Sequence, residues 1–374
     1  MSSYALLAQA WGAEVRGWDR VRTPYLEHLQ GIEVVIADDP PAPPAGWEVY
    51  VSSAFTDRVE GKSRAALLAE LISLRDAIVI AGAHGKTTTA GMIAFCLARL
   101  GRDPAWLIGA EVPQLGLNAG TGSGWLVVEG DESDRTIAAL RPSIAVVTNV
   151  DLDHHATFAS LAEVEALFER WLADVPDVVR GEELLPYDGP LALPGEHNRR
   201  NAACAVAALE RAGIGREEVA PVLAEFTGAG RRLERRGEAG GIAVFDDYAH
   251  HPAEIAATLD AARDGGRLLV LFQPHLYSRT RHLAGELADA LAAADAVAVA
   301  DVYPAREHPR EGVTGKLVVD ALAERRPGMP LAWTPQYDDG ARYLARRARA
   351  GDRILTIGAG DVDHAAPLLL ELLA

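Results

Sequence analysis

The chain has 374 residues, 49% of them hydrophobic and 24% charged, which is the balance of a folded protein with two or three domains. Its net charge of -17 repels a polyanion, so nucleic acid is not expected as a partner. No run reaches the roughly 18 apolar residues that span a bilayer, and the first residues lack the basic region of an export signal. Cys96 and Cys204 lie in alanine-rich helical patterns, typical of core residues in a reducing compartment. We therefore expect a cytoplasmic protein that is not bound to a membrane.

Strand-like apolar runs alternate with amphipathic helical stretches along the chain, which predicts an α/β fold with parallel sheets covered by helices. The prolines of DDPPAPPAG at 38–46 predict a loop inside the first domain. We place the domains at 1–75, 76–227 and 228–374. Strands are predicted at 77–81, 125–129 and 144–148 in the second domain, and at 242–245, 267–272, 296–300 and 353–357 in the third.

A glycine turn with a lysine follows the strand predicted at 77–81. Its sequence is GAHGKTTT at 82–89, and a helix is predicted over 90–100. Glycines let backbone N–H groups approach phosphate oxygens, and a helix N-terminus favours negative charge. Lys86 adds a mobile positive charge, and the Thr87 hydroxyl can bind Mg²⁺. The segment predicts a site for a nucleoside triphosphate.

The turn departs from the pattern G-x-x-x-x-G-K-[ST], because Ile80 stands where the first glycine should be. An ordinary strand-to-helix turn with an exposed lysine is therefore an alternative interpretation. Only Lys62, Lys86 and Lys316 are lysines, while every other basic residue is an arginine or a histidine. A lysine kept against that bias, between a strand and a helix, favours the nucleotide site.

Two polar segments follow the next two predicted strands: EGDESD at 129–134 and TNVDLDHH at 148–155. Open α/β sheets bind ligands at the carboxyl ends of their strands. Clustered carboxylates repel each other unless a cation offsets them, so Mg²⁺ bridging ATP phosphates accounts for these segments. Taken alone, each is better explained as a solvated loop or a helix cap.

The glycine turn and the first acidic segment resemble two signatures of the Mur ligase family, G-x-HGKTTT and E-x-DESD. The similarity extends over the whole chain through VTNVDLDH (147–154), GEHNRRN (195–201), GRRL (230–233), DDYAHHP (246–252), FQPHLYSR (272–279) and GAGD (358–361). The resemblance implies a three-domain Mur ligase architecture. Its parts are a Rossmann-like N-terminal domain for a UDP-sugar, a P-loop-type central ATPase domain and a Rossmann-like C-terminal domain for an amino acid.

The resemblance also implies an ATP site in which Lys86 acts on the β- and γ-phosphates. Arg232 and Asp247 of the third domain are implied to close on the γ-phosphate and ribose, which excludes water. Catalytic roles fall to Lys86, His250 and Arg232. The implied ATP-binding residues are Gly82, His84, Gly85, Lys86, Thr87, Thr88, Asn201, Arg232 and Asp247, and the implied Mg²⁺ ligands are Thr87, Glu132 and His154.

Within the family, DYAHHP and FQPH-x-x-x-R resemble members that join L-alanine to the lactyl carboxylate of UDP-N-acetylmuramate through an acyl phosphate, in peptidoglycan precursor synthesis. The later ligases use a carbamylated lysine, and no lysine lies here between Lys86 and Lys316. Arg279 is the implied partner of the alanine carboxylate, because a guanidinium binds it bidentately. The implied substrate-binding residues are Asp19, Ser53, Tyr248, His250, His275 and Arg279.

Alternatives remain open. Arg231 and Arg232 are also consistent with surface charge, and His250 with a helix cap or core residue. Family members open with a G-x-G-G-x-G-M-S loop for the diphosphate, of which Met1-Ser2 matches only the tail, before a helix at 4–11 and a strand at 14–17. Leu276 replaces an arginine of some relatives.

Two other functions are consistent with these departures. The first is a related Mur ligase that uses another amino acid or a peptide, and the second is a degenerate paralogue that binds nucleotide without turnover. The set of Lys86, Glu132, His154 and Arg232 argues against the second. We expect a monomer or a homodimer.

Overall fold

The computed structural model describes residues 1–52, 54–152, 157–305 and 307–374. Its contacts divide the chain into two compact units, each of them an α/β structure. The first unit comprises residues 1–152, 157–192 and 199–227, and the second contains 193–198 and 228–374. The three-domain boundaries at 75 and 227 stay a prediction.

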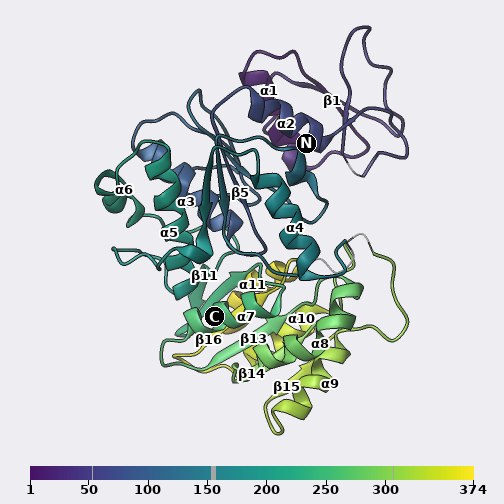
Figure 1. The fold of residues 1–374 in the computed structure, drawn as a ribbon. Coiled ribbons are helices and arrows are strands. Elements are labelled where there is room, and N and C mark those ends of the chain that lie inside the picture. The colour runs from purple at the N-terminus through teal and green to yellow at the C-terminus, as the bar shows by residue number, and fades with distance from the viewer. Residues whose placement is uncertain (53, 153–156, 306) are drawn as a thin grey trace. The chain divides into compact units, whose positions relative to one another are not determined.

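The first unit is built on a six-stranded sheet in the order β10-β9-β5-β8-β6-β7 (Figure 1). All neighbouring strands are parallel except β6 and β7. The central strands are almost wholly apolar and buried, as expected where helices cover both faces of a sheet. The bounds are β5 Ala77–Ala81, β6 Ala105–Leu107, β7 Ala119–Thr121, β8 Leu126–Glu129, β9 Ile144–Val147 and β10 Asp177–Arg180.

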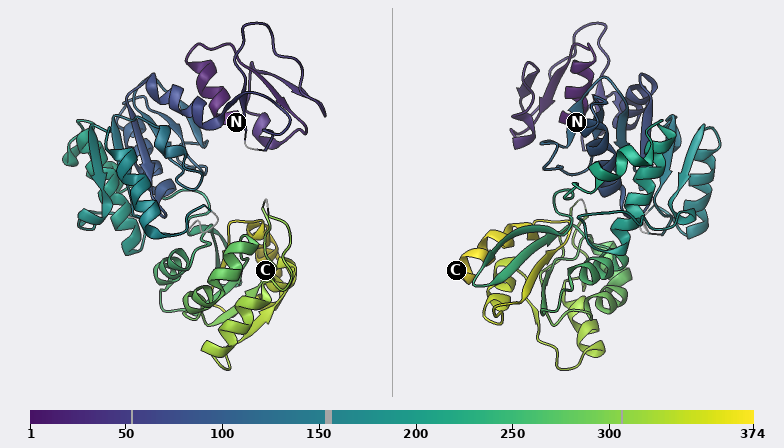
Figure 2. Two further views of the ribbon diagram at one scale, coloured as in Figure 1. Left: turned by 45° about the vertical axis from the view of Figure 1, so that its right-hand side comes forward. Right: turned by 90° about the vertical axis from the view of Figure 1, so that its left-hand side faces the viewer.

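Helices pack on both faces of this sheet (Figure 2). On one face, α1, α2 and α4 bury side chains against Ala77, Val79 and Ala81. On the other lie α3 and α6, and the ring of Phe95 on α3 has its centroid 5.5 Å from that of Phe226, which follows α6. The bounds are α1 Ser2–Ala10, α2 Arg64–Ser73, α3 Lys86–Arg99, α4 Leu161–Leu172, α5 Glu196–Arg211 and α6 Arg216–Leu223, with short helices η2 Thr136–Ala139 and η3 Gly181–Glu183.

The first 75 residues add two small parallel strand pairs, β1 with β2 and β3 with β4. The helix predicted at 4–11 occurs as α1, and the strand predicted at 14–17 lies two residues later. The proline-rich segment 38–46 contains neither helix nor strand, which confirms the predicted loop. The bounds are β1 Arg16–Asp19, η1 Pro24–Leu26, β2 Glu33–Ile36, β3 Tyr50–Val51 and β4 Lys62–Ser63.

Helix α3 begins earlier than predicted, at Lys86 instead of residue 90. The reason is Gly85, which precedes the helix with a φ of 82°. Glycine adopts this left-handed conformation without steric cost, so the turn closes within one residue and the helix starts at once. Lys86 and Thr87 therefore belong to the first helical turn, where backbone N–H groups have no partner inside the helix.

The second unit contains a six-stranded sheet in the order β11-β12-β16-β13-β14-β15 (Figure 1). Only β11 and β12 are antiparallel. Helices α7, α8 and α9 pack on one face, and α10 and α11 on the other. The bounds are β11 Glu234–Ala239, β12 Ile242–Asp247, β13 Leu268–Phe272, β14 Ala296–Val299, β15 Leu331–Trp333, β16 Arg353–Ile357, α7 Pro252–Ala262, α8 Tyr277–Leu291, α9 Lys316–Arg325, α10 Tyr337–Ala345, η4 Val362–His364 and α11 Ala365–Leu373.

The predicted parallel sheet covered by helices is present in this region, but sequence reasoning missed both edge strands. Strand β11 reads ERRGEA and carries a register shift between Arg235 and Gly237, so it shows no alternation of apolar and polar residues. Strand β15 has three residues, too few for a periodic signal. Among the described residues, no helix combines the length and apolar character that crossing a bilayer requires.

Arg231 holds together the loops at the carboxyl ends of β12 and β16. Its Nε donates to Asp246 Oδ2 (2.8 Å), and its Nη1 and Nη2 donate to the carbonyls of Gly360 (2.9 Å) and Gly358 (2.7 Å). Asp246 is fully buried and also accepts from Thr356 Oγ1. Three convergent bonds and a buried counter-ion make Arg231 a structural clamp instead of surface charge.

We predict that Arg231→Ala lowers the free energy of unfolding by about 3–5 kcal/mol, because it leaves the Asp246 carboxylate buried without its cation. Urea unfolding measures this loss. The matched control is Arg235→Ala, which removes an exposed arginine paired with Glu238 and should change stability by at most about 1 kcal/mol. A loss below about 1 kcal/mol for Arg231→Ala would contradict the clamp.

Candidate active site

In the first unit, Lys86 is largely buried and folded back onto Glu132. Its Nζ lies 3.0 Å and 3.2 Å from the two carboxylate oxygens, and the carbonyls of Gly82 and Ala83 also accept from it. Only 3% of Glu132 is exposed. Burial alone would lower the pKa of Lys86, but the nearby carboxylates, Glu132 first, outweigh it and hold the pKa above its ordinary value. Lys86 is therefore a positive charge held beside the glycine turn by Glu132 and the carbonyl of Gly82.

The two glycines of the turn make room for the polar side chains that support it. A Cβ on Gly82 would lie 2.3 Å from Thr148 Oγ1, and one on Gly85 would lie 2.2 Å from Asn201 Oδ1. Both distances are shorter than van der Waals contact, so only glycine fits. The turn thus packs against polar groups after β9 and on α5, and its backbone can approach a ligand closely.

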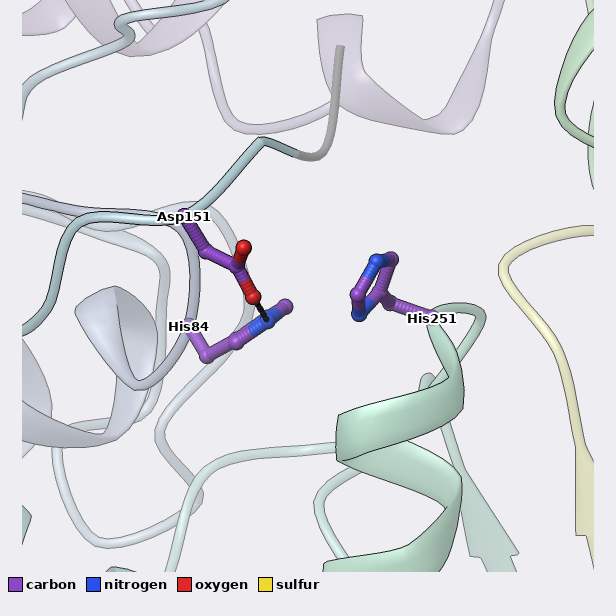
Figure 3. Close-up of side chains that lie close together, drawn as sticks. All are labelled: His84, Asp151 and His251. Atoms are coloured by element: carbon purple, nitrogen blue, oxygen red, sulfur yellow. Dashed lines mark ion pairs between the residues drawn. The ribbon is translucent and has the colours of Figure 1, made fainter. Parts of the chain in front are cut away.

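His84 is fixed at the centre of the turn by residues that follow β9. Its backbone N–H donates to Asn149 Oδ1 (3.0 Å), and its carbonyl accepts from Thr148 Oγ1 (2.6 Å) and Asn149 Nδ2 (2.9 Å). The Asp151 carboxylate points at the imidazole, with Nε2 and Oδ2 3.9 Å apart (Figure 3). These contacts set the backbone of the turn before any ligand arrives.

A second carboxylate, Glu129, ends β8 beside the turn. It accepts from the Thr87 hydroxyl (3.0 Å) and from the backbone N–H of Gly109 (2.6 Å). Thr87, Glu129 and Glu132 therefore offer hard oxygen ligands at the start of α3, which is the donor set that Mg²⁺ prefers. Sequence reasoning placed Glu129 in the acidic segment attributed to Mg²⁺, but it named only Thr87 and Glu132 of these three as ligands.

The structure brings together most residues predicted for the ATP site in this unit. The turn and the first residues of α3 contribute Gly82, His84, Gly85, Lys86, Thr87 and Thr88, and Glu132 and Asn201 join them through the contacts above. Asp19 ends β1, where its carboxylate accepts from the Arg20 N–H (2.7 Å). Ser53 and His154 lie outside the described residues.

In the second unit, four aromatic rings form a row across the carboxyl ends of β12, β13 and β14. Centroids are 5.6 Å apart for Tyr248 and His250, 5.7 Å for His250 and His275, and 5.9 Å for His275 and Tyr303. Arg279 is 5% exposed, and its Nη1 lies 3.3 Å from His275 Nδ1. The four residues predicted for the amino-acid pocket are thus neighbours, and Tyr303 was not predicted.

Arg232 and Asp247 lie next to Tyr248, at one end of this row. Asp247 accepts from the backbone N–H groups of Leu233 and Ala249, both at 2.7 Å. Burial raises the pKa of Asp247 to about 6, although the Arg232 cation and these two N–H groups act against the rise. The guanidinium carbons of Arg231 and Arg232 lie 5.2 Å and 5.3 Å from the Tyr248 ring centroid, so the ring contacts two cations.

His251 and Glu254 form a capping box at the start of α7. The Glu254 carboxylate accepts from the backbone N–H groups of His250 (3.0 Å) and His251 (3.3 Å). The His250 Nδ1 lies 3.0 Å from the carbonyl of Tyr248. Because a carbonyl only accepts, Nδ1 carries the proton and the lone pair of the neutral ring is on Nε2. Glu254 thereby holds the backbone of His250, and the Tyr248 carbonyl orients its ring.

Comparison with known proteins identifies the class. The family model for the Mur ligase middle domain matches residues 80–179, and the model for the Mur ligase, glutamate ligase domain matches residues 231–360. Together with full-length relatives above 30% identity, these matches show that the chain belongs to the Mur ligase family.

Several relatives carry one particular name. The curated UDP-N-acetylmuramate--L-alanine ligase of Thermobifida fusca is 37% identical, and the alignment covers 100% of this chain and 94% of the relative. The protein of that name from Kineococcus radiotolerans is 39% identical, again with 100% and 94% covered. The crystal structure of UDP-N-acetylmuramate-alanine ligase from Thermotoga maritima gives a TM-score of 0.79 at 24% identity, covering 99% of this chain and 96% of that one. At that identity the structural match shows the fold.

We predict that Lys86→Met lowers the free energy of unfolding by about 3–5 kcal/mol, because Glu132 keeps a buried charge without its counter-ion. Adding Glu132→Gln removes the charge and should restore at least half of the loss. Lys62→Met is the control, since its pairs with Glu48 and Glu70 are exposed to solvent and their removal should change stability little. If urea unfolding finds the double variant no more stable than Lys86→Met, the two residues are not coupled.

We predict a pH signature for Asp247, whose pKa of about 6 exceeds the ordinary 3.8. The folded chain binds this proton more tightly than the unfolded chain, so the stabilisation is present below about pH 4 and is lost as the pH rises to about 6. Relative to Asp247→Asn, wild-type stability should fall by up to about 3 kcal/mol across that window. Unfolding curves at several pH values measure the difference, with the exposed Asp39→Asn as control. A flat difference would show that Asp247 is not held protonated.

Proposed function

We propose that this chain uses ATP to join L-alanine to the lactyl carboxylate of UDP-N-acetylmuramate, through an acyl phosphate, in peptidoglycan precursor synthesis. The observation that carries an ATP-dependent reaction is the glycine turn with Lys86 against the buried Glu132. Full-length similarity to relatives named UDP-N-acetylmuramate--L-alanine ligase supports the choice of substrates. The activity is that of an acid–amino-acid ligase.

The charges of the turn suit a triphosphate with its cation. Lys86 and Glu132 now neutralise each other. When both ligands bind, Lys86 would pair with phosphate and Glu132 with Mg²⁺, so each buried charge would exchange one opposite partner for another. Thr87 and Glu132, with Glu129 beside them, are the described residues that would hold Mg²⁺, and His154 stays a predicted ligand. Bound Mg²⁺ would offset negative charge on the phosphates and help orient them.

The first step activates the carboxylate. A carboxylate oxygen attacks the γ-phosphorus, the bond to the β,γ-bridging oxygen breaks, and ADP leaves while an acyl phosphate forms. Two anions must approach each other, so fixed cations are required, and we assign this role to Lys86 and Arg232. The roles of Asn201 and Asp247 at adenine and ribose, and of Asp19 and Ser53 at the UDP-sugar, stay predictions.

The second step forms the amide bond. The L-alanine amine attacks the acyl carbon, a tetrahedral intermediate forms, and the C–O bond to phosphate breaks. Arg279, buried beside His275, is the proposed partner of the alanine carboxylate. The ammonium must lose a proton before attack, and Nε2 of His250 is the proposed acceptor. Tyr248 and His275 complete the proposed pocket.

We place the reaction in the cytoplasm. Cys96 and Cys204 are both buried as free thiols, which is consistent with a reducing compartment. A monomer or a homodimer stays a prediction. One observation favours a second candidate, a related ligase for another amino acid: Leu276, directly after His275, stands where some relatives have arginine.

Phosphate release from ATP tests the proposal. Purified chain with Mg²⁺, ATP and UDP-N-acetylmuramate should release phosphate at a high rate only when L-alanine is added, and Lys86→Met should lower that rate at least about 100-fold. Glycine, L-serine and an alanyl dipeptide are tested in parallel. A faster rate with another acceptor would assign the chain to a related ligase. No acceptor-dependent release from the wild type would support the non-catalytic alternative.

A further inference from the structure

The loop between β14 and α9 contacts the proposed amino-acid pocket at two points. We propose that Tyr303 and Glu307 of this loop are positioning residues that hold His275 and the first turn of α8, and with them Arg279, in place for the amino-acid substrate. This inference rests on the proposed function and deepens it, because neither residue belongs to the motifs that indicated the pocket.

Tyr303 packs against His275 and against Gly360, which lies in the turn after β16. Its ring stacks on the imidazole with centroids 5.9 Å apart and planes 14° from parallel. A Cβ on Gly360 would lie 2.5 Å from Cγ of Tyr303, so the glycine permits close packing against this side chain. The carbonyl of Gly360 is itself held by Arg231 (2.9 Å). A chain of contacts therefore links Arg231 to the His275 ring through Gly360 and Tyr303.

Backbone pairing fixes the same two segments. The N–H of Tyr303 donates to the carbonyl of Pro274 (2.8 Å), and the N–H of Leu276 donates to the carbonyl of Tyr303 (2.9 Å). These bonds form a parallel bridge between His275 and Tyr303. With the backbone paired and the ring stacked, His275 has little freedom to rotate. Arg279 then has a fixed neighbour, His275 Nδ1, at 3.3 Å.

Glu307 holds the start of α8. Its Oε2 accepts from the backbone N–H of Ser278 (2.8 Å), and its Oε1 accepts from the Ser278 hydroxyl. A carboxylate at a helix N-terminus satisfies a backbone donor and favours the helix dipole. Burial alone would raise the pKa of Glu307, but the bonds from Ser278 outweigh it and hold the pKa below its ordinary value. Arg279 directly follows the residue that Glu307 fixes.

The backbone of Leu276, in the turn between His275 and Arg279, is strained. It has a φ of 68° and a ψ of 133° at the N-cap of α8, a backbone conformation that residues other than glycine rarely adopt. Such strain persists only where the surroundings impose it, and it is concentrated at functional sites. Here the bridge to Tyr303 imposes it. The turn from His275 to Arg279 is therefore held in shape by the loop that carries Tyr303.

Steady-state kinetics of the full chain tests the inference. Tyr303→Leu keeps apolar bulk but removes the stacked ring, and Glu307→Ala removes the cap. Each should raise the KM for L-alanine about tenfold or more while the KM for ATP changes less than about twofold, because only the pocket in the second unit is disturbed. Tyr303→Phe keeps the ring and should recover most of the wild-type KM for L-alanine. Glu311→Ala, an exposed position on the same loop, is the matched control and should match the wild type.

Thermal unfolding of each variant separates positioning from folding. A variant that is folded at the assay temperature and shows the KM split supports the inference. Equal rises in both KM values, or an unchanged KM for L-alanine in folded Tyr303→Leu and Glu307→Ala, overturn it. The wild type separates this inference from the proposed function. If it turns over with another amino acid, the KM of that amino acid is compared instead, and if it turns over with none, the proposed function and the inference both fail.

Discussion

The site in the first unit depends on one interaction, the buried ion pair between Lys86 and Glu132. Placing an ammonium and a carboxylate away from water is costly unless each compensates the other, and here carbonyls of the turn add further bonds to the ammonium. Glycines at 82 and 85 make the arrangement sterically feasible, since any side chain there would meet Thr148 or Asn201. The pair keeps opposite charges where a triphosphate and its cation would need them.

The second unit also contains a buried ion pair, between Arg231 and Asp246, but this pair holds loops in place. Arg231, paired with the fully buried Asp246, holds the glycine turn after β16, and that turn supports Tyr303 and so the row of rings that ends at Tyr248. Arg231 holds the ends of two parallel strands, β12 and β16, whereas Arg232 next to it interacts with Asp247 and Tyr248. The two adjacent arginines thus have different roles: Arg231 stabilises the structure, and Arg232 is proposed to act in the reaction.

Much of this organisation could be predicted from the sequence, because apolar runs such as 77–81 and 353–357 are unambiguous and the motifs sit at the strand ends that follow them. Edge strand β11 could not, since its charged residues and bulge carry no period. The start of α3 was placed four residues late because the left-handed Gly85 allows an abrupt helix start. The roles of Arg231 and Tyr303 were missed because they arise from contacts with residues far along the chain.

In the proposed reaction, the turn that carries Lys86 holds ATP while its γ-phosphoryl group passes to a carboxylate. Isotope transfer tests it most directly: UDP-N-acetylmuramate is labelled with ¹⁸O in its lactyl carboxylate, and the phosphate released during ligation is examined by mass spectrometry. We expect one labelled oxygen to pass from each reacting carboxylate into phosphate, because the acyl C–O bond breaks after phosphorylation. Released phosphate without the label, alongside amide formation, would contradict it.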